Sequence, residues 1–317
     1  MVSFSKKCGF VILLLIVGFS ARVWAEEKKF KGKGFESPQQ AVEVLIEAVK
    51  SNDGKGIIDI LGTDSLDLVQ SGDPVADRLD REKFVEVFGI HHGVQEEGPE
   101  RVIIIIGEKE WPFPIPLEKQ NDQWFFDVSA GKDELLSRRI GRNEIDVINV
   151  LNTYVDAQND YAKKDLGGDG VHAFASCIRS DQGKRNGLFW PVKEGESMSP
   201  LGPLVAEAAA QGYGAKYPKS MPYHGYYFKV LRGQGKHAYG GAFDYQKQGK
   251  MVLGHALLAY PAKYGASGIM TFMVNQQGVI YEKDLGPNTP KLAKAITTFD
   301  PDQSWHETDL QVLTGVK

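Results

Sequence analysis

The chain has 317 residues, and its 41 acidic side chains outnumber its 37 basic ones, which gives a net charge of −4. A mildly acidic chain has no general attraction for nucleic acid or anionic lipid, so neither is expected as the main partner. The length suits about two domains, each large enough to bury a core of its own.

The first 25 residues have the pattern of a secretory signal peptide. Two lysines precede an apolar run from Gly9 to Phe19, and Val23 and Ala25 supply the small side chains that a signal peptidase needs. The run is shorter than the roughly 20 residues of a membrane-spanning helix, although an uncleaved anchor stays the alternative. We expect cleavage after Ala25, a periplasmic or secreted protein, and no stable membrane insertion.

Cleavage would leave Cys177 as the only cysteine, so no internal disulfide is expected. Its neighbours in HAFASCIRS are largely apolar, which favours a buried and inert thiol. A reactive or intermolecular role is the alternative.

Residues 26–34 are charged and contain glycine, which is typical of a flexible leader. The first regular element follows directly. Ser37 is a good N-cap, Pro38 suits the first helical position, and Gln40 completes a capping box. These signals predict a helix that stops at Asn52.

A first domain is expected over residues 35–137. Further helical patterns lie at 56–62 and 80–92, and strand patterns follow at 101–108, 110–120 and 123–129. Helices that precede an antiparallel sheet indicate a compact α+β domain in which the helices pack on that sheet.

Pro112, Pro114 and Pro116 alternate in the segment WPFPIPL, so their missing amides all fall on one side of a strand. Such a strand can pair on its other side only. We interpret the segment as a blunted sheet edge that resists aggregation. An extended, polyproline-like lip of a cleft is the alternative.

The second domain is expected over residues 138–309, with a C-terminal tail at 310–317. Gly141 permits a tight turn and Asn143 can then cap a long helix that runs to about Lys164.

A long loop rich in glycine and proline comes next, with one short helix near 203–211. Four strand patterns follow, and the last two form a hairpin around Gln276-Gln277-Gly278. The second domain is therefore expected to be a long helix packed over an antiparallel β-meander.

Five blocks of the sequence are peculiar enough to carry a resemblance: SGDPVADR at 71–78, WPFPIPL at 111–117, RRIGRNE at 138–144, GLFWP at 187–191 and IMTFMVNQQGVIYEKDLGPNT at 269–289. With these blocks the chain resembles an exported bacterial family catalogued as domain of unknown function 2950. The resemblance runs from about Phe35 to Thr308, and it implies no catalytic residues.

The two halves also resemble known folds. The first, with helices against a curved sheet, is similar to the cone-shaped nuclear-transport-factor-2-like fold. The second, with a long helix over a meander, is similar to the globular part of pilins and pseudopilins. Pilins carry a Glu five residues into a continuous hydrophobic helix, and Leu14 stands at that place here. Polymerisation through an N-terminal helix is therefore not expected.

The candidate binding residues are three arginines and one tryptophan. Arg138, Arg139 and Arg142 lie among acidic residues, which favours a salt-bridged junction between the domains. An anion or carboxylate site is the alternative, because guanidinium groups bind such groups in a bidentate way. Trp190 lies near several tyrosines that either cover the core or stack on a sugar or a protein partner.

No motif of a catalytic or metal centre is present. His91 and His92 are adjacent and cannot share one helical face, so they are not expected to chelate a metal together. The stretch 165–170 lacks the spacing of an EF-hand, which leaves a looser pair of Asp165 and Asp169 against a plain glycine-rich helix end. We expect neither a metal nor a cofactor.

Three functions remain in competition. The first is a non-catalytic binding or protein-interaction module of the cell envelope, with an envelope protein or a small ligand as its partner. The second is an envelope enzyme in the cone-like domain, with Asp127 or His91 as acid or base. The third is an accessory subunit of a secretion or pilus machine.

Overall fold

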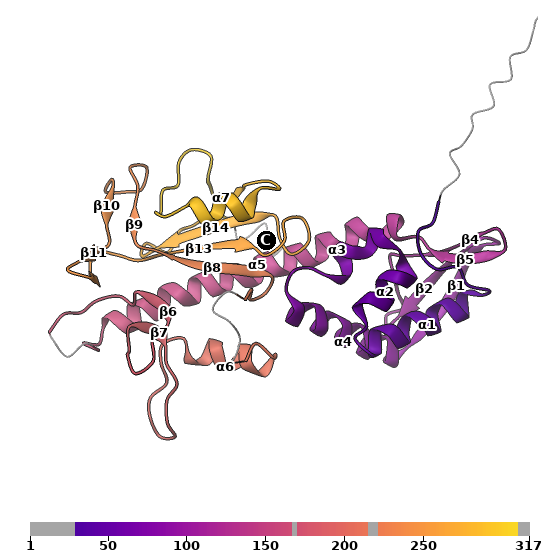
Figure 1. Cartoon of the computed structure of the whole chain (residues 1–317), viewed down its shortest axis with the longest axis horizontal. Helices are drawn as coiled ribbons and strands as arrows, with labels where there is room; N and C mark the ends of the chain where they lie inside the picture. The colour runs from indigo at the N-terminus through magenta and orange to yellow at the C-terminus, as the bar shows by residue number, and fades with distance from the viewer. Residues whose placement is uncertain (1–28, 167–169, 215–220, 310–317) are drawn as a thin grey trace, which may run out of the picture.

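The computed structural model describes residues 29–166, 170–214 and 221–309. Two units lie at opposite ends of an elongated molecule, and the long helix α5 (Val128–Ala162) runs through both (Figure 1). The N-terminal unit comprises everything before α5 together with the first part of that helix. The C-terminal unit comprises the rest of α5 and all that follows.

Helices form the first layer of the N-terminal unit. They are α1 (Pro38–Lys50), α2 (Gly54–Leu61), the 3-10 turn η1 (Thr63–Ser65), α3 (Leu66–Val69) and α4 (Pro74–Ile90). The caps are the ones that the residue types favour. The side chain of Ser37 accepts a hydrogen bond from the Gln40 amide, and Asp53 and Asp73 cap α2 and α4 in the same way.

The second layer is an antiparallel sheet. Its strands are β1 (His92–Gly98), β2 (Arg101–Ile106), β3 (Trp111–Pro112), β4 (Leu117–Gln120) and β5 (Gln123–Phe126), in the order β1-β2-β4-β5 with β3 also paired to β2. Along β2 every second residue is buried, so one face of the sheet packs on the helices. Asn121 and Asp122 form the β4–β5 turn with positive φ angles of 51° and 61°.

The proline segment 111–117 forms an edge of the sheet, and its apolar side chains line a hollow beside the helices. The amide of Phe113 donates to the Ile104 carbonyl of β2 at 2.7 Å, so the neighbouring Pro112 and Pro114 place their ring nitrogens on the outer side. The expected blunted edge is therefore present at Pro112 and Pro114, whereas Pro116 faces the end of β5, because its carbonyl accepts the Asp127 amide at 2.8 Å. The side chains of Trp111, Phe113 and Ile115, which alternate with the prolines, line one hollow with residues of the helices.

The C-terminal unit contains a second antiparallel sheet in the order β16-β15-β14-β13-β8. Its strands are β8 (Tyr226–Leu231), β13 (Ala256–Pro261), β14 (Met270–Asn275), β15 (Ile280–Asp284) and β16 (His306–Glu307). Helix α5 covers one face and α7 (Thr289–Ala295) covers the other (Figure 1). Because both faces are covered, every residue of β13 is buried.

Shorter elements surround this sheet. They are β6 (Cys177–Arg179), β7 (Gly187–Phe189), α6 (Gly202–Ala210), β9 (Gly233–Gln234), β10 (Phe243–Asp244), β11 (Gln246–Lys247) and β12 (Lys250–Met251). The α+β class, the meander and the closing hairpin agree with the sequence. No helix within the described ranges is long and apolar enough to cross a membrane.

The start of the long helix is where the sequence-based expectation was wrong. Helix α5 begins at Val128 and passes without a break through Gly141 and Asn143, which were expected to form a turn and a cap. Asn143 is buried instead, and its side-chain amide donates to the Ser267 carbonyl at 2.9 Å. The expected boundary between residues 137 and 138 thus falls inside a continuous helix.

Candidate functional site

An open groove of about 390 Å³ lies in the N-terminal unit, between α4, the first part of α5 and the sheet. We call it the arginine groove. Most of its wall is apolar: Leu45, Val49, Ile57, Leu61, Leu68, Val69, Phe84, Val87, Ile106, Trp111, Phe113, Ile115 and Leu135. Phe84, Val87, Trp111 and Phe113 are only half buried, so the groove presents apolar surface to solvent.

The polar lining comes from two helices at helical spacing. Asp77, Asp80, Arg81 and Lys83 lie on α4, the helix that also supplies Phe84 and Val87. Arg138, Arg139 and Arg142 lie on α5, one to two turns after Leu135. Residues three and four apart share a face of a helix, so the charged and the apolar side chains of each helix face the same groove. Five cations and two carboxylates line the groove.

Arg139 is the most enclosed of the three arginines on α5, with 13% of its side chain exposed. Its guanidinium donates to the carbonyls of Asp67 at 2.9 Å and Leu68 at 2.5 Å, at the α3 end of the groove. Its Nε lies 3.5 Å from Asp80, which pairs more closely with Arg142 at 2.8 Å. The hydrogen bonds of Arg139 thus end on neutral carbonyl oxygens, and its ion pair with Asp80 is the longer contact.

Arg81 faces the same hollow from α4. Its guanidinium donates to Asn52 Oδ1 at 2.6 Å and to the Val69 carbonyl at 3.2 Å, again neutral oxygens. Burial lowers the pKa of Arg81, Asp77 opposes this effect, and the nearby Arg139 lowers the pKa further. Arg81 and Arg139 thus lie close enough in the groove to repel each other, and Asp77 and Asp80 offset part of that repulsion.

Arg138 and Asp77 have local partners. Arg138 pairs with Glu134 at 2.7 Å, and its guanidinium lies over the Trp111 ring at 5.0 Å from the centroid. The buried carboxylate of Asp77 accepts the Ser71 amide at 3.1 and 3.2 Å. Burial raises the pKa of Asp77, and its hydrogen bonds to Ser71 oppose that rise.

A set of polar contacts fixes the two units to each other beside the groove, and we call it the joint. Asp67 pairs with Lys263 of the C-terminal unit at 2.8 Å and with Lys132 of α5 at 3.0 Å, which holds the pKa of Asp67 below its usual value. Asp73 is fully buried and accepts hydrogen bonds from the Tyr213 hydroxyl and the Gly225 amide, both at 2.9 Å.

The family model described as protein of unknown function (DUF2950) matches residues 32–308. The chain belongs to this family. No curated protein and no solved structure matches the chain. The pilin-like and nuclear-transport-factor-2-like resemblances therefore stay predictions.

Three of the five blocks that carry the resemblance to DUF2950 meet at the groove and the joint. Block 71–78 supplies Asp73 and Asp77, block 111–117 supplies the aromatic wall, and block 138–144 supplies the arginines. Block 269–289 begins beside them, because Glu144 of α5 accepts the amides of Ile269 and Met270, both at 2.9 Å.

Trp190 lies apart from the three arginines with which it was grouped as a candidate. It packs in the C-terminal unit, with its ring edge-on to Tyr161 at 6.4 Å and the Arg185 guanidinium over it at 5.4 Å. The aromatic residues that do accompany the arginines are Phe84, Trp111 and Phe113. The helical and strand periodicities show that these three residues lie on apolar faces. They do not show that the faces meet at the arginines, because that depends on how the helices pack on the sheet.

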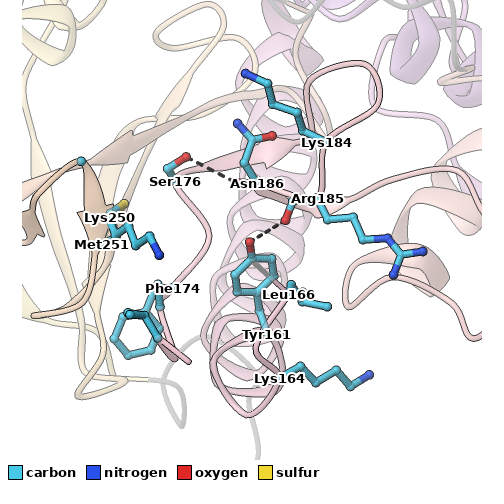
Figure 2. Close-up of a pocket in the computed structure, with 13 residues that line it drawn as sticks. Tyr161, Lys164, Leu166, Phe174, Ser176, Lys184, Arg185, Asn186, Lys250 and Met251 are labelled. Carbon is cyan, nitrogen blue, oxygen red and sulfur yellow. Dashed lines mark hydrogen bonds between the residues drawn. The ribbon is translucent and has the colours of Figure 1, made fainter. Parts of the chain in front are cut away.

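A second hollow, of about 240 Å³, lies in the C-terminal unit and has four cations in its lining: Lys164, Lys184, Arg185 and Lys250. Figure 2 shows that the side chains of Lys164, Lys184 and Arg185 extend in different directions and do not converge on one point. The Tyr161 hydroxyl donates to the Arg185 carbonyl at 2.5 Å. This arrangement does not form an anion cradle.

A third hollow, of about 440 Å³, lies between α5, α6 and β8 and has a mainly aliphatic and aromatic lining. Cys177 contributes to its wall. The thiol is half buried and donates to the carbonyls of Arg179 and Asn186, at 3.2 and 3.4 Å.

The residues considered for catalysis or metal binding do not line the arginine groove. His91 ends α4 with its Nε2 3.7 Å from Glu110, and His92 stacks on Phe88. Asp127 is buried before α5 and accepts the Ser129 hydroxyl at 2.6 Å. Within the described residues no cluster of His, Cys, Asp and Glu could hold a metal ion. Asp169, part of the looser calcium hypothesis, lies outside the described residues.

Proposed function

We propose that this DUF2950 protein is an exported, non-catalytic binding protein whose N-terminal unit holds an apolar small molecule in the arginine groove. The observation that carries the proposal is the open, mainly apolar hollow of about 390 Å³ with half-buried aromatic side chains in its wall. Its volume falls within the range of about 300–1,000 Å³ that small-molecule pockets occupy.

Binding is favoured over catalysis by the lining. Among the described residues that line the groove there is no Ser, Thr, Cys, Tyr or His. The groove lining therefore offers neither a hydroxyl or thiol nucleophile nor a histidine as general base. The two carboxylates, Asp77 and Asp80, already accept hydrogen bonds from Ser71 and Arg142. A role as an accessory of a secretion or pilus machine has no specific contact in its favour.

The groove is tested with N-phenyl-1-naphthylamine, an uncharged dye that fluoresces strongly in apolar surroundings. We expect saturable binding to the protein without residues 1–25. Val87→Trp places a bulky ring in the half-buried wall and should abolish most of this signal. Leu253→Trp adds the same ring at an exposed position outside the groove and is the matched control.

Two results would contradict the proposal. One is a dye signal that rises linearly without saturation. The other is equal binding by the Val87→Trp and Leu253→Trp variants, both still folded by circular dichroism, since the dye would then occupy some other place.

Export is part of the same proposal and rests on residues 1–25, which lie outside the described residues. We expect the intact mass of protein from the native envelope to correspond to a chain that begins at Glu26. A mass that retains residues 1–25, in material that dissolves only in detergent, would support the anchor alternative instead.

A further inference from the structure

We propose that the ligand of the arginine groove is a single-chain carboxylate, such as a fatty acid, whose head group binds between Arg81 and Arg139. This inference rests on the proposed function and adds the chemical class of the ligand. The chain would lie on the apolar wall formed by Phe84, Val87, Ile106 and Phe113.

The charge of the groove favours an anion over a cation. Five cations line it against two carboxylates, and both carboxylates have partners. Asp80 pairs with Arg142 at 2.8 Å, and Asp77 accepts the Ser71 amide at 3.1 Å. An ammonium group would therefore meet repulsion from the arginines without an unengaged carboxylate to pair with.

Arg81 and Arg139 are the two cations able to bind the head group. A guanidinium has five N–H donors. Arg81 and Arg139 each donate two hydrogen bonds, and Arg139 Nε also lies 3.5 Å from Asp80. All four of those bonds end on uncharged oxygens. A carboxylate that bridges the two groups would accept hydrogen bonds from both guanidinium groups, in a hollow whose lining has five cations and two carboxylates.

The size of the groove favours one chain over two. A volume of about 390 Å³ lies near the lower end of the range for small-molecule pockets. Each buried methylene contributes about 0.8 kcal/mol, so a single chain of moderate length supplies enough apolar contact for measurable binding. A phospholipid with two chains and a bulky head group does not suit this volume.

The experiment compares ligands that share a chain and differ in the head group. Dodecanoate, dodecanol and dodecyltrimethylammonium are titrated into the protein loaded with the neutral dye N-phenyl-1-naphthylamine, below their micelle concentrations. We expect dodecanoate to displace the dye at a concentration at least about tenfold lower than dodecanol, because a hydrogen-bonded charge pair is worth that factor or more. The ammonium compound should be the weakest competitor.

Substitutions of Arg81 and Arg139 then test whether these two residues cause the preference for dodecanoate over dodecanol. Arg81→Gln and Arg139→Gln should each reduce the preference for dodecanoate over dodecanol several-fold, while the dodecanol affinity stays unchanged. Arg101→Gln is the matched control, since Arg101 belongs to the same unit but pairs with Glu97 and Glu118 outside the groove. Unchanged dye binding by a variant shows that the groove is still intact.

The outcomes separate the two proposals. Failure of every ligand and of the dye to bind overturns the proposed function itself. Dye binding with equal displacement by dodecanoate and dodecanol leaves the apolar groove standing and overturns the carboxylate inference. A preference for dodecanoate that survives both arginine variants also overturns it, because the head group then binds elsewhere.

Discussion

His255 is a buried polar side chain with an unusual environment. It is fully buried, its ring lies edge-on to Phe174 at 4.7 Å and to Tyr154 at 5.3 Å, and neither ring nitrogen has a hydrogen-bond partner among the described residues. Burial lowers the pKa of His255 to about 4, from 6.5 in an exposed setting. The folded protein therefore holds this imidazole neutral.

This shift predicts a loss of stability in mild acid. Between pH 6.5 and 4 the unfolded chain binds a proton at this site that the folded chain does not, so the free energy of unfolding falls as the pH falls. This loss of stability is absent well above pH 6.5 and amounts to about 3 kcal/mol by pH 4. Urea unfolding of the wild type and of His255→Leu at pH 7.5 and 4.5 measures it.

We compare the free energy of unfolding of His255→Leu with that of the wild type at each pH. The difference should shift in favour of the variant by about 2–3 kcal/mol between pH 7.5 and pH 4.5. His306→Leu, at an exposed position, is the control and should follow the wild type at both pH values. Parallel pH dependence of the wild type and His255→Leu would mean that a water or another group satisfies the ring.

At the scale of single elements, α5 contains two glycines in contrasting surroundings. Gly131 is buried against the proline segment, and a Cβ there would overlap the carbonyl group of Pro114. Gly141 has nothing within 4 Å of the place that a Cβ would take. The same substitution should therefore have opposite effects at two positions of one helix.

Gly131→Ala should destabilise the protein by about 1–3 kcal/mol, because the helix must move away from the wall of the groove. Gly141→Ala should stabilise it by about 0.5–1 kcal/mol, since alanine is the better helix former. Thermal and urea unfolding of both variants measure the difference. A loss of stability in Gly141→Ala would point to a break in the helix there, as the sequence had suggested.

Some helices and turns of the structure could be predicted from the sequence, and others could not. The α1 cap and the β14–β15 hairpin depend on neighbouring residues, so local patterns identified them. Strand β1 was missed, because His92–Gly98 is polar and almost wholly exposed and shows no alternation. The start of α5 was missed because the partner of Asn143, the Ser267 carbonyl, is 124 residues away in the sequence.

The candidate site was predicted only in part, for the same reason. Arg138, Arg139 and Arg142 stood out as a cluster, and their helix does place all three in the lining of the groove. Nothing local connects them to Arg81 or Phe113, since those contacts arise when α4 and the sheet pack against α5. Trp190 was selected for its aromatic neighbours, which lie in the other unit.

At the scale of the whole molecule, the joint depends on Asp73. Its carboxylate caps α4 through the amides of Val75 and Ala76, and it also accepts the Tyr213 hydroxyl and the Gly225 amide from the C-terminal unit. Asp53 caps α2 in a comparable way but at an exposed position without such a second role.

Asp73→Ala should therefore lower the free energy of unfolding by about 2–4 kcal/mol, because it removes a cap and leaves buried donors unsatisfied. Asp53→Ala removes only a cap and should cost about 1 kcal/mol. Urea denaturation compares the two variants. Equal losses would mean that the contacts with Tyr213 and Gly225 add nothing to stability.

The unbroken helix has a geometric consequence for how the chain length can vary. Within six residues, Arg139 and Arg142 bind the N-terminal unit, while Asn143 and Glu144 bind the segment 267–270 of the C-terminal unit. One residue inserted after Arg142 would turn one unit against the other by about 100° and displace it by about 1.5 Å. Helix α5 therefore fixes the rotation of one unit relative to the other. A single-residue insertion or deletion between Arg142 and Asn143 would break the contacts of one of the two units.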